Sequence, residues 1–363
     1  EEYNRKCREN VMMFTAEWRK LTEEMGYFVD LDNPYITYDN KYIETLWWLL
    51  KQLYNKGLLY KGYTIQPYSP GAGTGLSSHE LNQPGCYRDV KDLTTTVQFL
   101  IKDAKADWCK WGKPYFLAWT TTPWTLPSNV ALCVGPKIDY VAVETYNLYN
   151  GEPMTLVMAE NLVKSYLKPE HECKEGDLLP FDKEKKVCPW RVIDRMKGTE
   201  LEDLHYEQLM PWVKPCEKVD DFAPDFVKAY AAAHPEKVFS SEDGRDRFVE
   251  METEAFRVIL GDYVTTDDGT GIVHIAPTFG ADDAKVAKDA NIPALYLINK
   301  KGETRPMVDL QGKFYVIDDL DANFVNACVN KEAYSRHAGD YVKNAYDPKF
   351  NVDGVWDKAA SDK

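Results

Sequence analysis

The segment 118–129, which reads AWTTTPWTLPSN, constrains the fold of this chain more than any other stretch. Residues 115–120 are aromatic or apolar up to the first threonine, a composition that favours a β-strand. Pro123 and Pro127 then end strand pairing and hold the residues between them extended. Three consecutive hydroxyls therefore gather at the end of a strand. They either bond to the local backbone, as in a threonine-rich edge strand, or line a place where a ligand or a water is held.

A second segment, 268–283, also combines turn residues with polar side chains and reads DGTGIVHIAPTFGADD. Its Gly-Thr-Gly turn leads into a short strand over 272–276, and a loop with proline and glycine then delivers two aspartates to the start of a helix. His274 lies in the middle of that strand, so we expect its side chain to point away from those of its two neighbours. A lone histidine in a strand is commonly structural, and helix capping is a sufficient role for Asp282.

The remaining elements do not alternate regularly. Apolar residues recur at helical spacing over 11–25 and 43–54, and a glycine follows each stretch, so we expect two helices with buried apolar stripes. Asn150-Gly151 predicts a hairpin turn between two strands. The expected strands and a further helix cover 94–101, 138–146, 154–159 and 221–237. Strands scattered among helices favour an α+β fold with a closed or strongly curved sheet over a doubly wound fold.

Composition limits the class of protein. With 363 residues and 44% hydrophobic content, the chain can form one large domain with a smaller helical part. It has no apolar run near the roughly 20 residues of a membrane span and no signal peptide in its charged start, so we expect a monomeric, cytosolic protein without membrane contact. Eight cysteines form no Cys-x-x-Cys pair, which argues against a zinc knuckle or a disulfide framework. A net charge of −14 predicts weak binding of nucleic acid by this chain alone.

Together the two segments resemble the editing domain of isoleucyl-tRNA synthetase, the insertion that interrupts the catalytic domain of class I synthetases for branched aliphatic amino acids. The related valyl and leucyl enzymes carry Arg and Glu in the first motif where this chain has Thr122 and Trp124. The valyl enzyme has Lys in place of His274. Short strings at 75–80 and 197–201 agree with the same family, so the resemblance covers nearly the whole chain.

The resemblance implies the organisation of the chain. We expect an α+β editing domain with a β-barrel-like core and peripheral helices over 106–320. A connective scaffold of helices and strands over 1–105 would lead into it. A return segment over 321–363, partly frayed, would lead back toward the catalytic body.

The resemblance also bears on cofactors. The ATP-handling signatures of the family, His-x-Gly-His and Lys-Met-Ser-Lys-Ser, are absent from these residues, so the chain is expected to be an excised insertion that does not activate amino acids. The full enzyme would use ATP and Mg²⁺. Some relatives bind zinc through a Cys-x-x-Cys whose positions here hold Ser69 and Ala72. We therefore expect no metal or cofactor in this chain, and any zinc of the full enzyme outside it.

Particular residues acquire roles from the resemblance. The expected catalytic group is Thr120, Thr121, Thr122 and Asp283, with Asp283 binding the α-amino group of the misattached amino acid. Because threonine is a poor base at neutral pH, the hydroxyls would position water and ester rather than abstract a proton. The expected substrate-binding residues are Trp119, Trp124, Thr125, Asn129, His274 and Ala276. Among them, His274 would block isoleucine, the tryptophans would shape the pocket or stack on adenosine, and Asn129 would contact ribose or backbone.

The function implied is hydrolysis of the ester in valyl-tRNA(Ile), with valyl-adenylate as a further candidate substrate. Its partners would be the acylated 3′ end of tRNA(Ile) and the valine moiety. One methylene discriminates by only about 1–3 kcal/mol in a hydrophobic pocket, and this enzyme family is the known example, so a second sieve is needed. Two alternatives stay open: an editing domain of the valyl or leucyl type, and an inactive module that binds the acceptor end.

Overall fold

The computed structural model describes residues 1–60, 64–69, 72–87, 89, 93–174, 178–184, 187–343, 347–352 and 355–356. The chain divides into two compact units, Glu1–Tyr63 and Thr64–Lys363. Each is described here by itself. The predicted domain boundaries at 105 and 320 come from the family resemblance and do not coincide with this division. They stay predictions. The end of the predicted frayed segment, 357–363, lies outside the described residues.

The first unit consists of three helices, α1 (Glu2–Met13), α2 (Thr15–Glu24) and α3 (Asn40–Asn55). The helix predicted over 11–25 is in fact divided at Phe14, while α3 agrees with the prediction for 43–54. Asp39 caps α3 by accepting a hydrogen bond from the Lys41 N–H at 3.3 Å. The prediction of buried stripes was wrong: no residue of these helices is buried, and Trp47 is 69% exposed. Helical periodicity gives a helix an apolar face but does not supply the partner that covers it.

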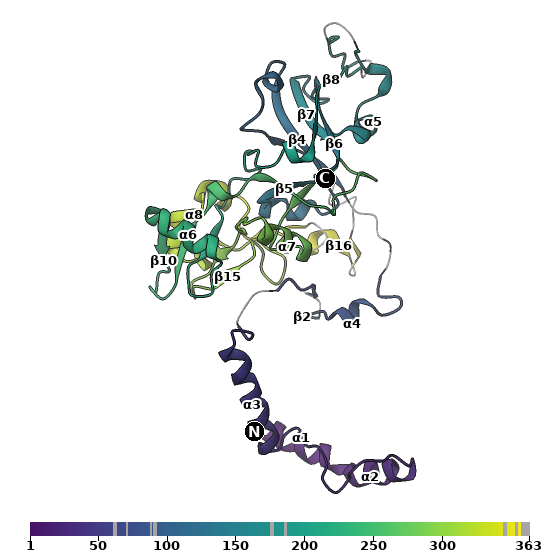
Figure 1. The fold of residues 1–363 in the computed structure, drawn as a ribbon, viewed down its shortest axis with the longest axis vertical. Coiled ribbons are helices and arrows are strands. Elements are labelled where there is room, and N and C mark those ends of the chain that lie inside the picture. Colours follow the sequence, from purple (N-terminus) through teal and green to yellow (C-terminus); the bar gives the residue numbers. More distant parts are fainter. Residues whose placement is uncertain are drawn as a thin grey trace. The chain divides into compact units, whose positions relative to one another are not determined.

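The largest sheet of the second unit has five strands (Figure 1). In spatial order they are β3 (Thr95–Leu100), β4 (Lys113–Thr120), β7 (Pro153–Ala159), β6 (Asp139–Tyr146) and β8 (Arg191–Lys197). The β4–β7 pair is parallel and the other pairs are antiparallel. The hairpin predicted at Asn150-Gly151 is confirmed, since β6 and β7 pair antiparallel on either side of it and Gly151 has a positive φ of 75°.

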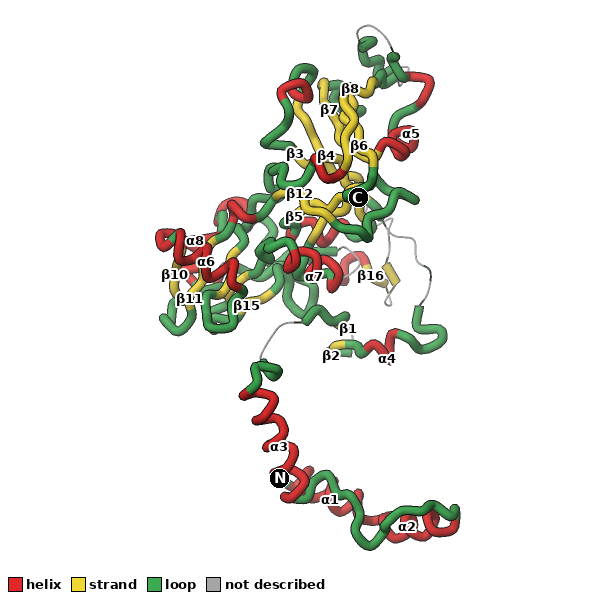
Figure 2. Tube along the Cα trace, viewed as in Figure 1, coloured by secondary structure: helices red, strands yellow, loops and turns green. Residues whose placement is uncertain are grey.

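A second sheet of three strands is centred on β5 (Ala131–Val134), with β12 (Arg257–Leu260) parallel on one side and β13 (Ile272–Ile275) antiparallel on the other. All four residues of β5 are fully buried. Strand β13 also lies against β4 of the larger sheet, and Figure 2 shows β5 and β12 directly beneath that sheet. The main core fills the space between the two sheets. No sheet of the described residues closes on itself, so the expected barrel-like core is built from two open sheets instead.

The rest of the second unit is made of short elements. The remaining strands form the sheets β10 (Val238–Ser240)–β11 (Arg247–Glu250)–β9 (Cys216–Lys218), β14 (Leu297–Ile298)–β15 (Thr304–Arg305), β1 (Tyr68–Ser69)–β2 (Thr74–Gly75) and β16 (Asn351–Val352)–β17 (Val355–Trp356). The α-helices are α4 (Ser78–Leu81), α5 (Val163–Tyr166), α6 (Asp225–Ala233), α7 (Ala281–Asp289), α8 (Ala322–Cys328) and α9 (Lys331–Ser335). This mixture confirms the α+β class.

Single 3₁₀ turns connect many of these elements. They are η1 (Ala106–Cys109), η2 (Pro123–Ser128), η3 (Glu160–Leu162), η4 (Pro169–His171), η5 (Gly198–Glu200), η6 (Pro235–Lys237), η7 (Glu252–Glu254), η8 (Ile317–Asp319) and η10 (Pro348–Phe350). Helix α6 is shorter than the predicted 221–237 because Pro224 precedes its first turn and Pro235 follows its end. Within the described part of the chain, no helix has both the length and the apolar character needed to cross a bilayer.

Candidate functional site

The fold brings the two motif segments together at one end of β4. Thr120 is the last residue of β4, η2 follows it, and the chain then enters β5. Because β13 pairs with β5 and lies against β4, His274 is opposite Leu132 and close to the threonines that end β4. The predicted gathering of hydroxyls at a strand end is therefore confirmed.

A cavity of about 470 Å³ lies at this junction. Eight of the ten predicted site residues line it, and three further residues complete its wall. The full set is Trp119, Thr120, Thr121, Thr122, Trp124, Thr125, Val273, His274, Phe279, Gly280 and Asp283. The structure thus joins residues that are about 150 positions apart in the sequence at one cavity, and their catalytic and binding roles stay predictions.

The threonine hydroxyls form a short chain. The Thr122 N–H donates to the Thr120 hydroxyl oxygen at 3.0 Å, and the Thr120 and Thr122 hydroxyls are 3.3 Å apart. The Thr125 hydroxyl is 3.3 Å from that of Thr122 and donates to the Thr122 carbonyl at 2.8 Å. Thr121 is exposed. Local bonding of hydroxyls to backbone therefore occurs here, but on the wall of a cavity rather than on an edge strand.

His274 is almost completely buried in this wall, with 7% of its surface exposed. Its Nε2 is 3.0 Å from the Thr125 hydroxyl oxygen. Burial lowers the pKa of His274 from 6.5 to about 4, so the ring is uncharged at neutral pH. Its Nδ1 is buried without a hydrogen-bond partner among the described residues. An uncharged imidazole in contact with Thr125 therefore forms part of the cavity wall.

Asp283 lies in the first turn of α7, as predicted, and is the one carboxylate among the residues that line the cavity. Its Oδ2 accepts a hydrogen bond from the Ala276 N–H at 2.8 Å. Burial raises the pKa of Asp283, the Ala276 hydrogen bond lowers it, and the neighbouring charge of Asp282 raises it. The net direction is upward, because burial outweighs the hydrogen bond from Ala276. A cationic ligand beside Asp283 would reverse that direction.

Two glycines allow close approaches to side chains that line the cavity. A Cβ at Gly280 would lie 2.9 Å from Cγ of Asp283, so the carboxylate needs a glycine beside it. Gly269, with φ of 73°, lies so close to Trp119 that a Cβ would meet the indole at 2.9 Å. The Gly-Thr-Gly turn therefore packs against Trp119. The indole of Trp124 is covered on one side, since Nζ of Lys343 lies 3.7 Å from its ring centroid.

Two predicted residues do not line the cavity. Asn129 is 2% exposed; its Nδ2 donates to the Ala131 carbonyl at 2.9 Å and its Oδ1 accepts from the Tyr206 hydroxyl at 2.7 Å. Ala276 is fully buried and reaches the site through its N–H, which holds Asp283. Asn129 therefore bonds to core residues, whereas Ala276 supports the cavity through its hydrogen bond to Asp283.

The sequence analysis did not predict three of the residues that line the cavity, and it predicted the wrong capping residue for α7. Val273, Phe279 and Gly280 were not singled out, although an aromatic and a glycine just before two aspartates are a signal of close packing at a helix start. Val273 lines the cavity together with its neighbour His274, so the strict alternation expected of β13 does not hold at its edge. The predicted capping role of Asp282 was wrong: the N-cap is Gly280, and Asp282 is an exposed residue of the first turn.

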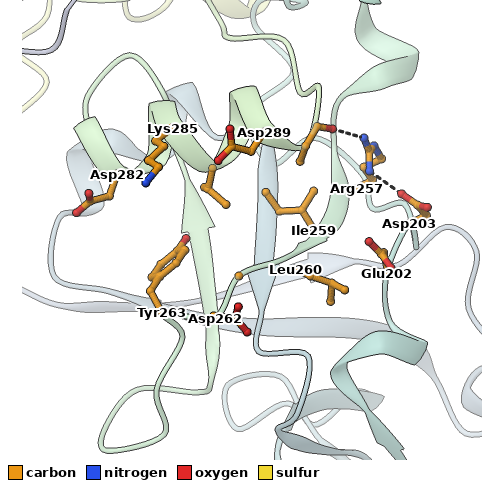
Figure 3. Close-up of a pocket in the computed structure, with 13 residues that line it drawn as sticks. Glu202, Asp203, Arg257, Ile259, Leu260, Asp262, Tyr263, Asp282, Lys285 and Asp289 are labelled. Atoms are coloured by element: carbon orange, nitrogen blue, oxygen red, sulfur yellow. Dashed lines mark hydrogen bonds and ion pairs between the residues drawn. The ribbon is translucent and has the colours of Figure 1, made fainter.

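A larger cavity of about 850 Å³ lies along the outer part of α7 (Figure 3). Five carboxylates and two basic side chains line it: Glu202, Asp203, Asp262, Asp282, Asp289, Arg257 and Lys285. Arg257 donates to Asp203 at 2.5 Å and to the Ala290 carbonyl at 2.8 Å, and the contact with Asp203 is marked in Figure 3. None of the ten predicted site residues lines this cavity. The smaller cavity is therefore the candidate site.

Metal binding receives no support from the described ranges, in which no three His, Cys, Asp or Glu side chains are grouped to hold an ion. Ser69 and Ala72 stand where some relatives have zinc-binding cysteines. Residues 70–71 between them lie outside the described part of the chain. The cysteines of the described residues are free thiols.

Comparison with known proteins supports the resemblance drawn from the motifs. The family model for class I tRNA synthetases (I, L, M and V) matches residues 1–299. The isoleucine–tRNA ligase of Bacteroides thetaiotaomicron is 59% identical over 99% of this chain, and that of Porphyromonas gingivalis is 55% identical over 96%. The chain spans 29% and 27% of the lengths of these relatives.

Among solved structures, the cytosolic leucyl-tRNA synthetase editing domain of P. knowlesi is similar to 55% of this chain, with 62% of its own length covered. The sequence identity is 14% and the TM-score is 0.33. This likeness is too weak to support an inference.

Proposed function

Because this chain belongs to the family of class I tRNA synthetases for isoleucine, leucine, methionine and valine, we propose that its smaller cavity is an editing site. It would hydrolyse the ester that joins valine to tRNA(Ile), and valyl-adenylate as a second substrate. The observation that carries the proposal is the joining of the threonine strand end, His274 and a single carboxylate at one cavity. The high identity to isoleucine–tRNA ligases supports the choice of tRNA(Ile).

Asp283 supplies the anchor for the substrate. An aminoacyl ester carries a free α-ammonium group, and Asp283 is the one carboxylate among the described residues that line the cavity. The Ala276 N–H fixes one carboxylate oxygen at 2.8 Å, which leaves the other for the ammonium. Pairing with a cation offsets the cost of burying this carboxylate. Binding and carboxylate ionisation therefore favour each other.

The threonines supply positioning groups. An aminoacyl ester is already activated, so the reaction needs an oriented water and a polarised carbonyl rather than a protein nucleophile. Thr121 is exposed and Thr122 is half-buried at the cavity, where their hydroxyls can bond to a water or to the terminal ribose. A ribose hydroxyl of the substrate can assist the proton transfer that threonine performs poorly. Trp119 and Trp124 would flank the adenosine.

His274 supplies the sieve. It is uncharged, almost fully buried and held by Thr125, so it cannot easily move aside for one more methyl group. A wall of this kind discriminates by about 1–3 kcal/mol per methylene. Acting after a first selection, it would reject isoleucine and accept valine.

The ligation reaction would take place in another part of the protein that contains this segment. The protein that contains this segment would attach isoleucine to its tRNA, as the names of its relatives indicate. It would use ATP and Mg²⁺ for this ligation. This segment would contact the acylated 3′ end of the tRNA as a monomer in the cytoplasm. Its charge of −14 disfavours a strong hold on the tRNA body.

A deacylation assay with three esters tests the proposal. The chain, and a chimeric ligase in which it replaces the matching segment of the Bacteroides thetaiotaomicron enzyme, would be incubated with valyl-, isoleucyl- and threonyl-tRNA(Ile). We expect rapid release of valine and slow release of isoleucine. Preference for threonyl esters would instead indicate a valyl-type site. Binding of a nonhydrolysable valyl-adenosine analogue without release of valine from the ester would indicate an inactive binding module.

A further inference from the structure

We infer that Thr125 is a positioning residue that fixes the tautomer and orientation of His274, and that it thereby sets the side-chain specificity of the cavity. This inference rests on the proposed function for its effect on specificity. Its structural part, the hydrogen bond between Thr125 and His274, is tested separately.

The direction of the hydrogen bond follows from a count of protons. The Thr125 hydroxyl has one proton and donates it to the Thr122 carbonyl at 2.8 Å. Its contact with His274 Nε2 at 3.0 Å must then be one in which the hydroxyl oxygen accepts. The single proton of the uncharged ring is therefore on Nε2, and Nδ1 carries the lone pair.

The opposite arrangement is less favourable. If Thr125 donated to Nε2, the Thr122 carbonyl would keep its hydrogen bond from the Thr125 backbone N–H at 3.0 Å but lose the one from the hydroxyl, and the ring proton would be on Nδ1. That nitrogen is buried and has no partner among the described residues, so a buried N–H would be left unpaired. Buried donors without partners are rarer in proteins than acceptors with a spare lone pair. The two hydrogen bonds of Thr125 thus select one tautomer.

Thr125 also joins the two walls of the cavity. It belongs to η2, whereas His274 belongs to β13, and both side chains are at least 90% buried. The hydroxyl of Thr125 is the polar contact between these elements at the ring. Without it, the imidazole loses the restraint on its rotation about the Cβ–Cγ bond. The ring could then move, and the cavity would no longer have a fixed size for the substrate side chain.

Two variants separate this role from simple packing. Thr125→Val keeps the shape of the side chain and removes the hydroxyl, whereas Thr125→Ser keeps the hydroxyl and removes a methyl group. For Thr125→Val we expect the ratio of isoleucyl to valyl ester hydrolysis, measured as kcat/KM, to rise about tenfold, the lower end of what one methylene is worth. Thr125→Ser should restore the wild-type ratio, because specificity would follow the hydroxyl and not the volume.

A spectroscopic measurement tests the hydrogen bond without any substrate. In the chain labelled with ¹⁵N-histidine, two-bond ¹⁵N–¹H correlation spectra distinguish a protonated ring nitrogen from a bare one. The chain has six histidines, so the His274 signals are assigned by their loss in His274→Gln. At neutral pH we expect the uncharged Nε2–H form in the wild type and in Thr125→Ser. Thr125→Val should show a mixture of tautomers.

The outcomes are distinguishable. An Nδ1–H or charged ring in the wild type overturns the inference, even if neither Thr125 variant folds. An unchanged tautomer and an unchanged ester ratio in a folded Thr125→Val also overturn it. If wild-type protein hydrolyses no valyl ester while His274 has the expected tautomer, then the proposed function fails, the hydrogen bond stands, and the claim about specificity fails with the function.

Discussion

Residues of helix α7 line both cavities, but the cavities differ in volume and in the side chains that line them. The larger, about 850 Å³, is lined by five carboxylates, and the smaller, about 470 Å³, by one. Asp282 and Asp283 are adjacent in sequence, yet the first lines the larger cavity and the second the smaller. Volume therefore does not identify the site. The candidate site is recognised by one carboxylate among hydroxyls, indoles and an uncharged imidazole.

The largest effect on ester hydrolysis is expected when the charge of each aspartate is removed in turn. Asp283→Asn should lower kcat/KM for valyl ester hydrolysis by about 100-fold, because a buried ammonium loses its charged partner at a cost of about 3 kcal/mol. Asp282→Asn, the matched control one residue away, should stay within about twofold of wild type. Equal losses in the two variants would remove the distinction between the cavities.

A pH series sharpens the comparison through His274, since no histidine lines the larger cavity. The pKa of His274 is lowered from 6.5 to about 4 in the folded chain, so between these values the unfolded chain binds a proton that the folded chain does not. Stability is therefore fully present above about pH 6.5 and falls toward pH 4, by an amount on the order of 3 kcal/mol.

Urea unfolding of wild type and His274→Gln at several pH values measures this dependence. The variant should lack most of the decline that the wild type shows between about pH 6.5 and pH 4. Parallel declines in both proteins would mean that His274 titrates normally and is not buried in the wall.

Gly280 offers a steric test of the same carboxylate. In Gly280→Ala the new Cβ would lie 2.9 Å from Cγ of Asp283 and would displace the carboxylate from the Ala276 N–H. We expect valyl ester hydrolysis to fall about tenfold, since small displacements of a positioning group are costly, with little change in the urea midpoint. Lys285→Ala, on the same helix but at the larger cavity, is the control and should retain wild-type hydrolysis.

The smallest effect is expected at the larger cavity. Arg257 bonds to Asp203 and to the Ala290 carbonyl, just beyond the end of α7. Arg257→Ala should lower the free energy of unfolding by about 1–2 kcal/mol and leave the deacylation rate unchanged. A loss of deacylation at unchanged stability would show that the larger cavity takes part in the reaction after all.

Local signals in the sequence predicted local structure well. Asn150-Gly151 predicted the hairpin between β6 and β7, and the two aspartates predicted the start of α7. The prolines after Thr120 ended β4 as predicted, but the prediction that the residues between them are extended was wrong, since Pro123–Ser128 form the 3₁₀ helix η2. These features depend on backbone dihedrals and turn chemistry, which a few adjacent residues determine.

Features that depend on distant partners were less predictable. Asn129 was assigned to the substrate, but its amide is used by the Ala131 carbonyl and by Tyr206, which is 77 residues away in sequence. The apolar stripe of α3 was expected to be buried, and Trp47 is exposed. The expected barrel-like core consists of two open sheets among the described residues, with β13 paired with β5 of one sheet and lying against β4 of the other. No pattern in a single segment specifies such partners.

The pairing of β5 with β13 has a consequence for how the protein is made. Ala131 is paired with Ile275, so a long stretch of chain must be looped out before the two strands meet. During synthesis the threonines leave the ribosome well before His274 and Asp283 do. A nascent chain that stops before β13 therefore has the threonine hydroxyls but lacks both His274 and Asp283. Under the proposed function, hydrolysis would become possible only after α7 has been synthesised.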